Sequence, residues 1–121
     1  MRILKITTLI FLFSGLISSC QKEYFKKPVL DPNTPISFSN DLQPIMTSQC
    51  ASSGCHDKSY PPNLLKDKAY LALIDGGYID TLVPSQSILM TRLNKDMPKG
   101  KLPAGDISKF EVWMKQGAQE N

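Results

Sequence analysis

Apolar residues recur at helical spacing along most of this chain, and no stretch alternates for long enough to predict a strand. Cap-type residues at 39–41 precede Leu42, Ile45 and Met46, which would lie on one face of a helix. The pattern therefore predicts a first helix over 41–49.

Two shorter helices are predicted in the middle of the chain. Apolar residues at helical spacing fill 65–75, and the glycine pair that follows is a typical helix stop. Pro84–Ser85 opens the next helix, which would turn Ile88, Leu89 and Leu93 inward.

The last predicted helix spans 104–116 and has the most complete apolar stripe. Asp106 in its first turn and Lys115 in its last turn complement the helix dipole, and Gly117 is its stop. The apolar stripe consists of Ile107, Phe110, Trp113 and Met114. Because every predicted element is helical, we expect one all-α domain over 36–121.

Residues 1–19 follow a different pattern, that of a secretory signal peptide. A short basic start leads into the apolar run Ile6–Ile17, which is shorter than the roughly 20 residues that a membrane-spanning helix needs. The small residues before Cys20 resemble the processing site of bacterial lipoproteins, in which that cysteine is acylated. An ordinary cleavage site beside an incidental cysteine is the alternative interpretation. Acylation by more than one chain would hold the protein on a membrane.

Residues 20–35 carry prolines and charges without periodicity, and we interpret them as the lipidated N-terminus and a flexible tether. The protein is then an exported lipoprotein that faces the periplasm. Gln21 stands where an aspartate resembles an inner-membrane retention signal, so the outer membrane is favoured. Residues 20–23 slightly resemble surface-export signals, which makes the cell surface the alternative destination.

The net charge of +3 belongs largely to the signal peptide. Without Arg2 and Lys5, the remaining chain has 12 basic residues against 11 acidic ones. No basic stripe interleaved with aromatic residues is present, so the composition argues against nucleic acid as a partner. Export also places the two cysteines other than Cys20 in an oxidising compartment, as a disulfide or as cofactor tethers.

The segment Cys50-Ala-Ser-Ser-Gly-Cys55-His56 combines two thiols with the single histidine of the chain. A cysteine followed directly by histidine, with a second cysteine upstream, is the arrangement that attaches haem through two thioether bonds and one imidazole ligand. Positions i and i+5 lie about 140 degrees apart around a helix. The four intervening residues must therefore loop out, for which small, flexible side chains are suited.

The residues of this segment alone allow two other interpretations. Cys50 and Cys55 would also form a small disulfide loop, with His56 as a bystander. A zinc site is disfavoured because it needs four ligands and the chain has one histidine.

A methionine in a polar loop is the candidate for a second iron ligand. Met97 lies 41 residues after His56, in a polar loop where a methionine is not needed for packing in the core. Thioether sulfur is a soft ligand for haem iron, and the proline that follows Met97 would hold the loop across the haem face. Met90 is the competing ligand, whereas Met46 and Met114 lie on apolar helix faces and are predicted to be core residues.

From Phe38 to Ala118 the chain resembles a small, class I-like, single-haem cytochrome c domain of the kind found on bacterial lipoproteins. The departures are the four-residue gap between the cysteines, and Lys99 where small residues or proline are common. The resemblance is carried, in chain order, by Phe38–Ile45, Cys55–His56, Val83–Pro84 with Ser87, Leu89 and Arg92, Met97–Pro98 with Gly100, and Trp113 with Gly117–Ala118.

The resemblance implies helices packed around one covalently attached haem c and its iron. Cys50 and Cys55 would be the tethers, and His56 and Met97 the axial ligands. It implies a monomeric electron carrier, not an enzyme, that exchanges single electrons with redox protein partners. Two alternatives are a five-coordinate haem protein that binds small ligands or reacts with peroxide, and a haem-free binding lipoprotein stapled by a disulfide.

Overall fold

The computed structural model describes residues 30–98 and 102–121. Over these ranges the chain is helical and contains no strand, as the apolar spacing predicted. The predicted signal peptide 1–19, the predicted lipidation residue Cys20 and most of the predicted tether lie outside the described residues. None of the described helices is both long enough and apolar enough to cross a bilayer.

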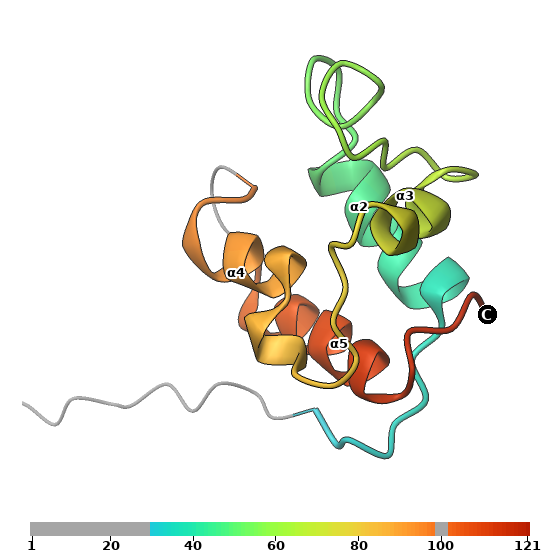
Figure 1. Ribbon diagram of the computed structural model, residues 1–121, viewed down its shortest axis with the longest axis vertical. Helices are drawn as coiled ribbons and strands as arrows, with labels where there is room; N and C mark the ends of the chain where they lie inside the picture. Colours follow the sequence, from blue (N-terminus) through green and yellow to red (C-terminus); the bar gives the residue numbers. More distant parts are fainter. Residues whose placement is uncertain (1–29, 99–101) are drawn as a thin grey trace, which may run out of the picture.

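The helices fall into two groups that meet at α5 (Figure 1). As drawn, α2 and α3 lie on one side of the molecule, α4 lies on the other, and α5 runs across the lower part. In chain order the elements are η1 (Phe38–Leu42), α2 (Gln43–Gln49), α3 (Ala69–Asp75), η2 (Pro84–Gln86), α4 (Ile88–Lys95) and α5 (Ala104–Lys115).

The first helical segment begins three residues earlier than predicted, with the π-helical turn η1. The cap is Ser37, whose Oγ accepts from the Asn40 N–H, and not a residue of the predicted group 39–41. The Ser37 N–H in turn donates to Asp41 Oδ2 at 2.8 Å, which completes a reciprocal cap. This reciprocal pair fixes the start of the helix one turn before the residues that the sequence pattern emphasised.

The predicted helix over 65–75 is shorter in the structure, since α3 begins at Ala69. A helical hydrogen bond does run from the Ala69 N–H to the Leu65 carbonyl. Lys68, however, has φ −127°, outside the helical region, and this interrupts the first turn. The predicted stop is confirmed: Gly76 caps the helix and Gly77 follows with φ +68°.

The segment predicted to open at Pro84 divides into two elements. Residues 84–86 form the short 3-10 helix η2, and α4 then starts afresh at Ser87, whose Oγ caps the Met90 N–H. The new start rotates the helix, so that Ile88 is 49% exposed and the prediction that it points inward is wrong. Met90 and Leu93 are the buried residues of α4.

An aromatic cluster joins η1, α3 and α5 at the centre of the core. The centroid of the Phe38 ring lies 5.3 Å from that of Trp113 and 5.2 Å from that of Tyr70. The contact with Tyr70 is edge-to-face. Such arrangements contribute about 0.5–1.5 kcal/mol beyond the area that they bury. The stripe predicted for α5 is confirmed, since all four of its residues are buried: Ile107, Phe110, Trp113 and Met114.

The two ends of the described chain are joined by polar contacts. Asn121 Oδ1 accepts from the Phe38 N–H at 2.7 Å, and the Asn121 carbonyl accepts from the Ser39 N–H. At the end of α5, Gln116 donates to the carbonyls of Pro32 and Thr34. The last residues of the predicted tether are therefore already bonded to the domain.

A matched pair of leucines tests this core. Leu42 is fully buried, whereas Leu82 is 91% exposed. Leu42→Ala should lower the free energy of unfolding by about 2–5 kcal/mol, because it removes buried methyl groups and leaves a cavity. Leu82→Ala should change it by less than about 0.5 kcal/mol. Denaturant unfolding followed by circular dichroism measures both values, and similar losses in the two variants would contradict the core described above.

Candidate functional site

The imidazole of His56 is held by backbone carbonyls of its own loop. Its Nδ1 lies 3.2 Å from the Tyr60 carbonyl oxygen and 3.1 Å from the Pro62 carbonyl oxygen. Carbonyl oxygens only accept, so Nδ1 carries the proton in a neutral ring. Nε2 then keeps its lone pair and is the nitrogen able to bind a metal, in the manner of oriented histidine ligands generally.

The loop around His56 is closed by main-chain hydrogen bonds. Helix α2 ends at Gln49, and the N–H groups of Cys50 and Ala51 both donate to the Met46 carbonyl. Two residues past the gap, the His56 N–H donates to the Cys50 carbonyl at 3.1 Å. The four intervening residues thus bulge out of the helical path, and the ends of the cysteine segment are brought together.

Gly54 allows the sharp bend in this bulge. Its φ of +81° lies in the left-handed region, which side chains with a Cβ rarely adopt. The neighbouring space is open, so that only backbone strain opposes a side chain at this position. A short, flexible insert was predicted between the cysteines, and Gly54 is the residue of that insert at which the chain reverses.

Asp57 organises the loop and was missed in the sequence analysis. Its Oδ2 accepts from the Gly54 N–H and its Oδ1 from the Ser59 N–H, each at 3.1 Å. Hydrogen bonds from Ser59, and then from Gly54, hold the pKa of this carboxyl below its ordinary value. The signal in the sequence is an aspartate two residues before a serine, a pattern that often forms an Asx turn.

Both cysteines of the segment carry free thiols. Cys50 is half-buried beside α2, and its pKa is raised first by burial and then by the nearby Cys55. Cys55 is exposed. Within the described ranges, no three His, Cys, Asp or Glu side chains gather closely enough to hold a metal ion.

The four methionines that the structure describes differ sharply in exposure. Met46 and Met114 are buried, as predicted for core residues. Met90, the competing ligand, is 1% exposed in α4, whereas Met97 is 44% exposed just after that helix. The Met97 N–H donates to the Arg92 carbonyl, which ties the start of the loop to α4.

The cysteine–histidine loop and the Met97 segment lie on the same side of α5. In Figure 1 the loop over 51–63 forms the upper end of the molecule, and the chain after α4 projects on that side as well. Arg92, on α4, pairs with Asp96 at 3.1 Å, and both side chains are largely exposed. Residues 99–101, which include the departure at Lys99, lie outside the described residues.

Comparisons with known protein families, with curated proteins and with solved structures find no match to this chain.

The Asp57 hydrogen bonds predict a pH dependence of the loop. The Asp57 carboxyl, followed by NMR, should titrate below about 3.9, the ordinary aspartate value. Exchange protection of the Gly54 and Ser59 amides should be complete above that ordinary value and lost as the pH falls through the lowered pKa. Asp57→Ala should remove the protection at every pH, whereas Asp75→Ala, at an exposed carboxylate, should not. A midpoint at or above the ordinary value would contradict this role.

Proposed function

We propose that this protein is a membrane-tethered c-type cytochrome that passes single electrons between redox proteins. Cys50 and Cys55 would attach one haem c through thioether bonds, and His56 and Met97 would bind its iron. The observation that carries the proposal is the orientation of His56, whose Nδ1 faces two carbonyls one residue after a free, exposed thiol.

The donor set fits a haem. When bound, haem supplies a one-electron couple at its iron, with a potential raised by paired histidine and methionine ligands. In this chain the carbonyls of Tyr60 and Pro62 accept from Nδ1–H, and this orients the ring so that Nε2 is the nitrogen available to bind iron. The thiol of Cys55 is exposed and that of Cys50 half-buried, so the two differ in access as well as in position.

Partly exposed apolar residues support the same proposal. Ile45, Ala51 and Leu89 pack against the core and yet remain partly open to solvent. An apolar macrocycle would remove such surface from water, which stabilises a domain by about 25 cal/mol for each square ångström buried. Domains of fewer than about 80 residues commonly use a cofactor or a staple of this kind, and this domain is close to that size.

Exposure favours Met97 over Met90 as the second iron ligand. Met90 fills the core beneath α4, and withdrawing its side chain would leave a cavity. The thioether of Met97 is free of that cost because almost half of its surface is already exposed.

Two firm axial ligands leave no open position for a substrate, so an electron carrier is favoured over a peroxidase-like protein. Acylation at Cys20 would anchor the carrier to a membrane facing the periplasm, with the outer membrane favoured and the cell surface as the alternative. Its partners would be the donor and acceptor proteins of an electron-transfer chain. The thiols of Cys50 and Cys55 are free, as thioether attachment to a haem requires.

Substitution of the two competing methionines tests the ligand assignment. Met97→Ala should keep the covalent haem, lose the sulfur-to-iron absorption band and lower the reduction potential by roughly 0.1 V or more, within the ~0.8 V range that axial ligands cover. Met90→Leu should keep both the band and the potential, and cost less than about 1.5 kcal/mol of stability. Absorption spectra and redox titration measure these effects.

Carbon monoxide provides the control for the ligand assignment. The reduced wild-type protein should not bind it without denaturation, whereas the reduced Met97→Ala variant should bind it rapidly. If Met90→Leu lost the sulfur-to-iron band while Met97→Ala kept it, Met90 would be the second iron ligand. Rapid binding by the wild-type protein would favour the five-coordinate alternative.

A further inference from the structure

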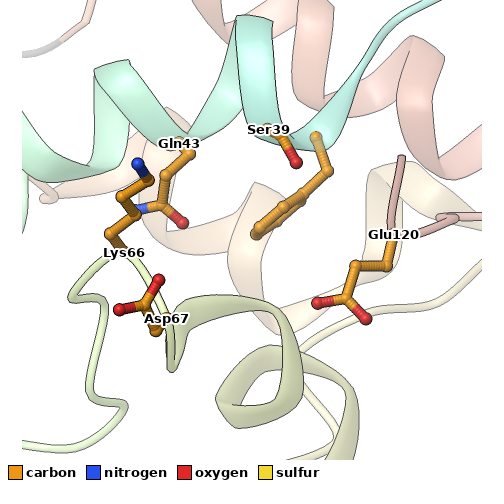
Figure 2. Close-up of a pocket in the computed structure, with 6 residues that line it drawn as sticks. Ser39, Gln43, Lys66, Asp67 and Glu120 are labelled. Atoms are coloured by element: carbon orange, nitrogen blue, oxygen red, sulfur yellow. The ribbon is translucent and has the colours of Figure 1, made fainter.

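A small cavity of about 260 Å³ lies between η1, the turn that precedes α3 and the C-terminal segment. Figure 2 shows its side chains arranged around one space, with Asp67 and Glu120 on opposite sides of it. No residue of the cysteine–histidine segment takes part. The lining residues are Phe38, Ser39, Gln43, Lys66, Asp67 and Glu120.

Gln43 presents an unpartnered oxygen at this cavity. The residue is only 4% exposed, and its Oε1 has no hydrogen-bond partner in the part of the chain that the structure describes. Its Nε2 donates to the Leu64 carbonyl at 3.2 Å and to Thr47 Oγ1 at 3.1 Å. The Leu64 carbonyl only accepts, so the amide cannot be turned around to exchange its oxygen for its nitrogen.

A buried hydrogen-bond acceptor without a partner has lost its bonds to water without replacement, which destabilises the fold. A ligand that supplies the missing donor would remove this penalty. In Figure 2 the Gln43 oxygen points toward the space that Asp67 and Glu120 flank. The lining therefore offers an amide oxygen, two carboxylates and the Ser39 hydroxyl, with Lys66 as its one cation. This set accepts several hydrogen bonds and has a net negative charge. A cation that donates more than one N–H matches this set.

We propose that this cavity binds a small primary amine in its protonated form. The ammonium group would donate to Gln43 Oε1, with Asp67 and Glu120 balancing its charge and the Phe38 ring lining the apolar side. The Gln43 oxygen is buried and has no hydrogen-bond partner among the described residues, so the site selects a nitrogen that can donate an N–H to it. The cavity shares no residue with the segment that binds haem in the proposed function, so either proposal stands if the other fails.

Titration of the purified full-length protein with methylammonium chloride, followed by NMR at constant ionic strength, tests the site. The Gln43 side-chain amide and the backbone amides of the lining residues should shift together and reach saturation. The dissociation constant should be on the order of 10 mM, near the limit that a ligand of two heavy atoms allows. Tetramethylammonium, which has the same charge but no N–H, should cause no such shifts.

Variants at two exposed carboxylates test the charge of the site, and a Gln43 variant tests the buried oxygen itself. Asp67→Asn and Glu120→Gln should each weaken binding roughly two- to fivefold, as expected for exposed carboxylates. Asp75→Asn makes the same change of charge at an exposed residue outside the cavity and should leave binding unchanged. Gln43→Met should abolish binding, with unfolding measured in parallel because it also removes two hydrogen bonds.

Three results would overturn the proposal. Equal chemical-shift changes with tetramethylammonium would show that the protein responds to positive charge alone and not to an N–H donor. Unsaturated shifts would show that no site exists. Shifts of the Gln43 amide on Lys66→Met, without any response to methylammonium, would mean that the chain's own lysine satisfies the oxygen.

Discussion

The contact of Phe38 with Trp113 is the interaction on which the arrangement of both helical groups depends. Phe38 opens η1 and Trp113 lies in α5, so their packing joins the η1–α2 segment to the helix at which the two groups meet. Asn121 reinforces it by bonding the backbone of Phe38 and Ser39. These contacts hold η1 against α5 and so fix the direction of α2. The position of Cys50, at the end of α2, is fixed as a result.

Beyond Cys50, the conformation of the loop is set by its own hydrogen bonds. The bulge at Gly54, the Asp57 hydrogen bonds and the two carbonyls facing His56 are all made within the loop itself. The imidazole is therefore oriented by carbonyls of its own loop. A ligand held in this way loses little conformational freedom on binding a metal, which favours a role as an axial ligand.

Apolar spacing was sufficient to predict the helical class and the buried face of α5, because that face is set by the 3.6-residue period alone. It was not sufficient for the start of η1 or for the outward turn of Ile88, since serine caps one residue outside the apolar pattern decide both. The cysteine–histidine segment was visible as a motif, but its hydrogen bonds were not, because loop carbonyls carry no side-chain signature. For the same reason the unpartnered oxygen of Gln43 became apparent only in three dimensions.

The most direct test of the account is whether haem is joined covalently to this chain. The full chain should be produced with export in a host that carries out cytochrome c maturation, beside a variant with alanine at Cys50 and Cys55. The account predicts a red product with a c-type pyridine haemochrome spectrum and an intact mass increased by one haem, and a variant without covalent haem. A colourless wild-type product with the mass of the bare, disulfide-bonded polypeptide would contradict it.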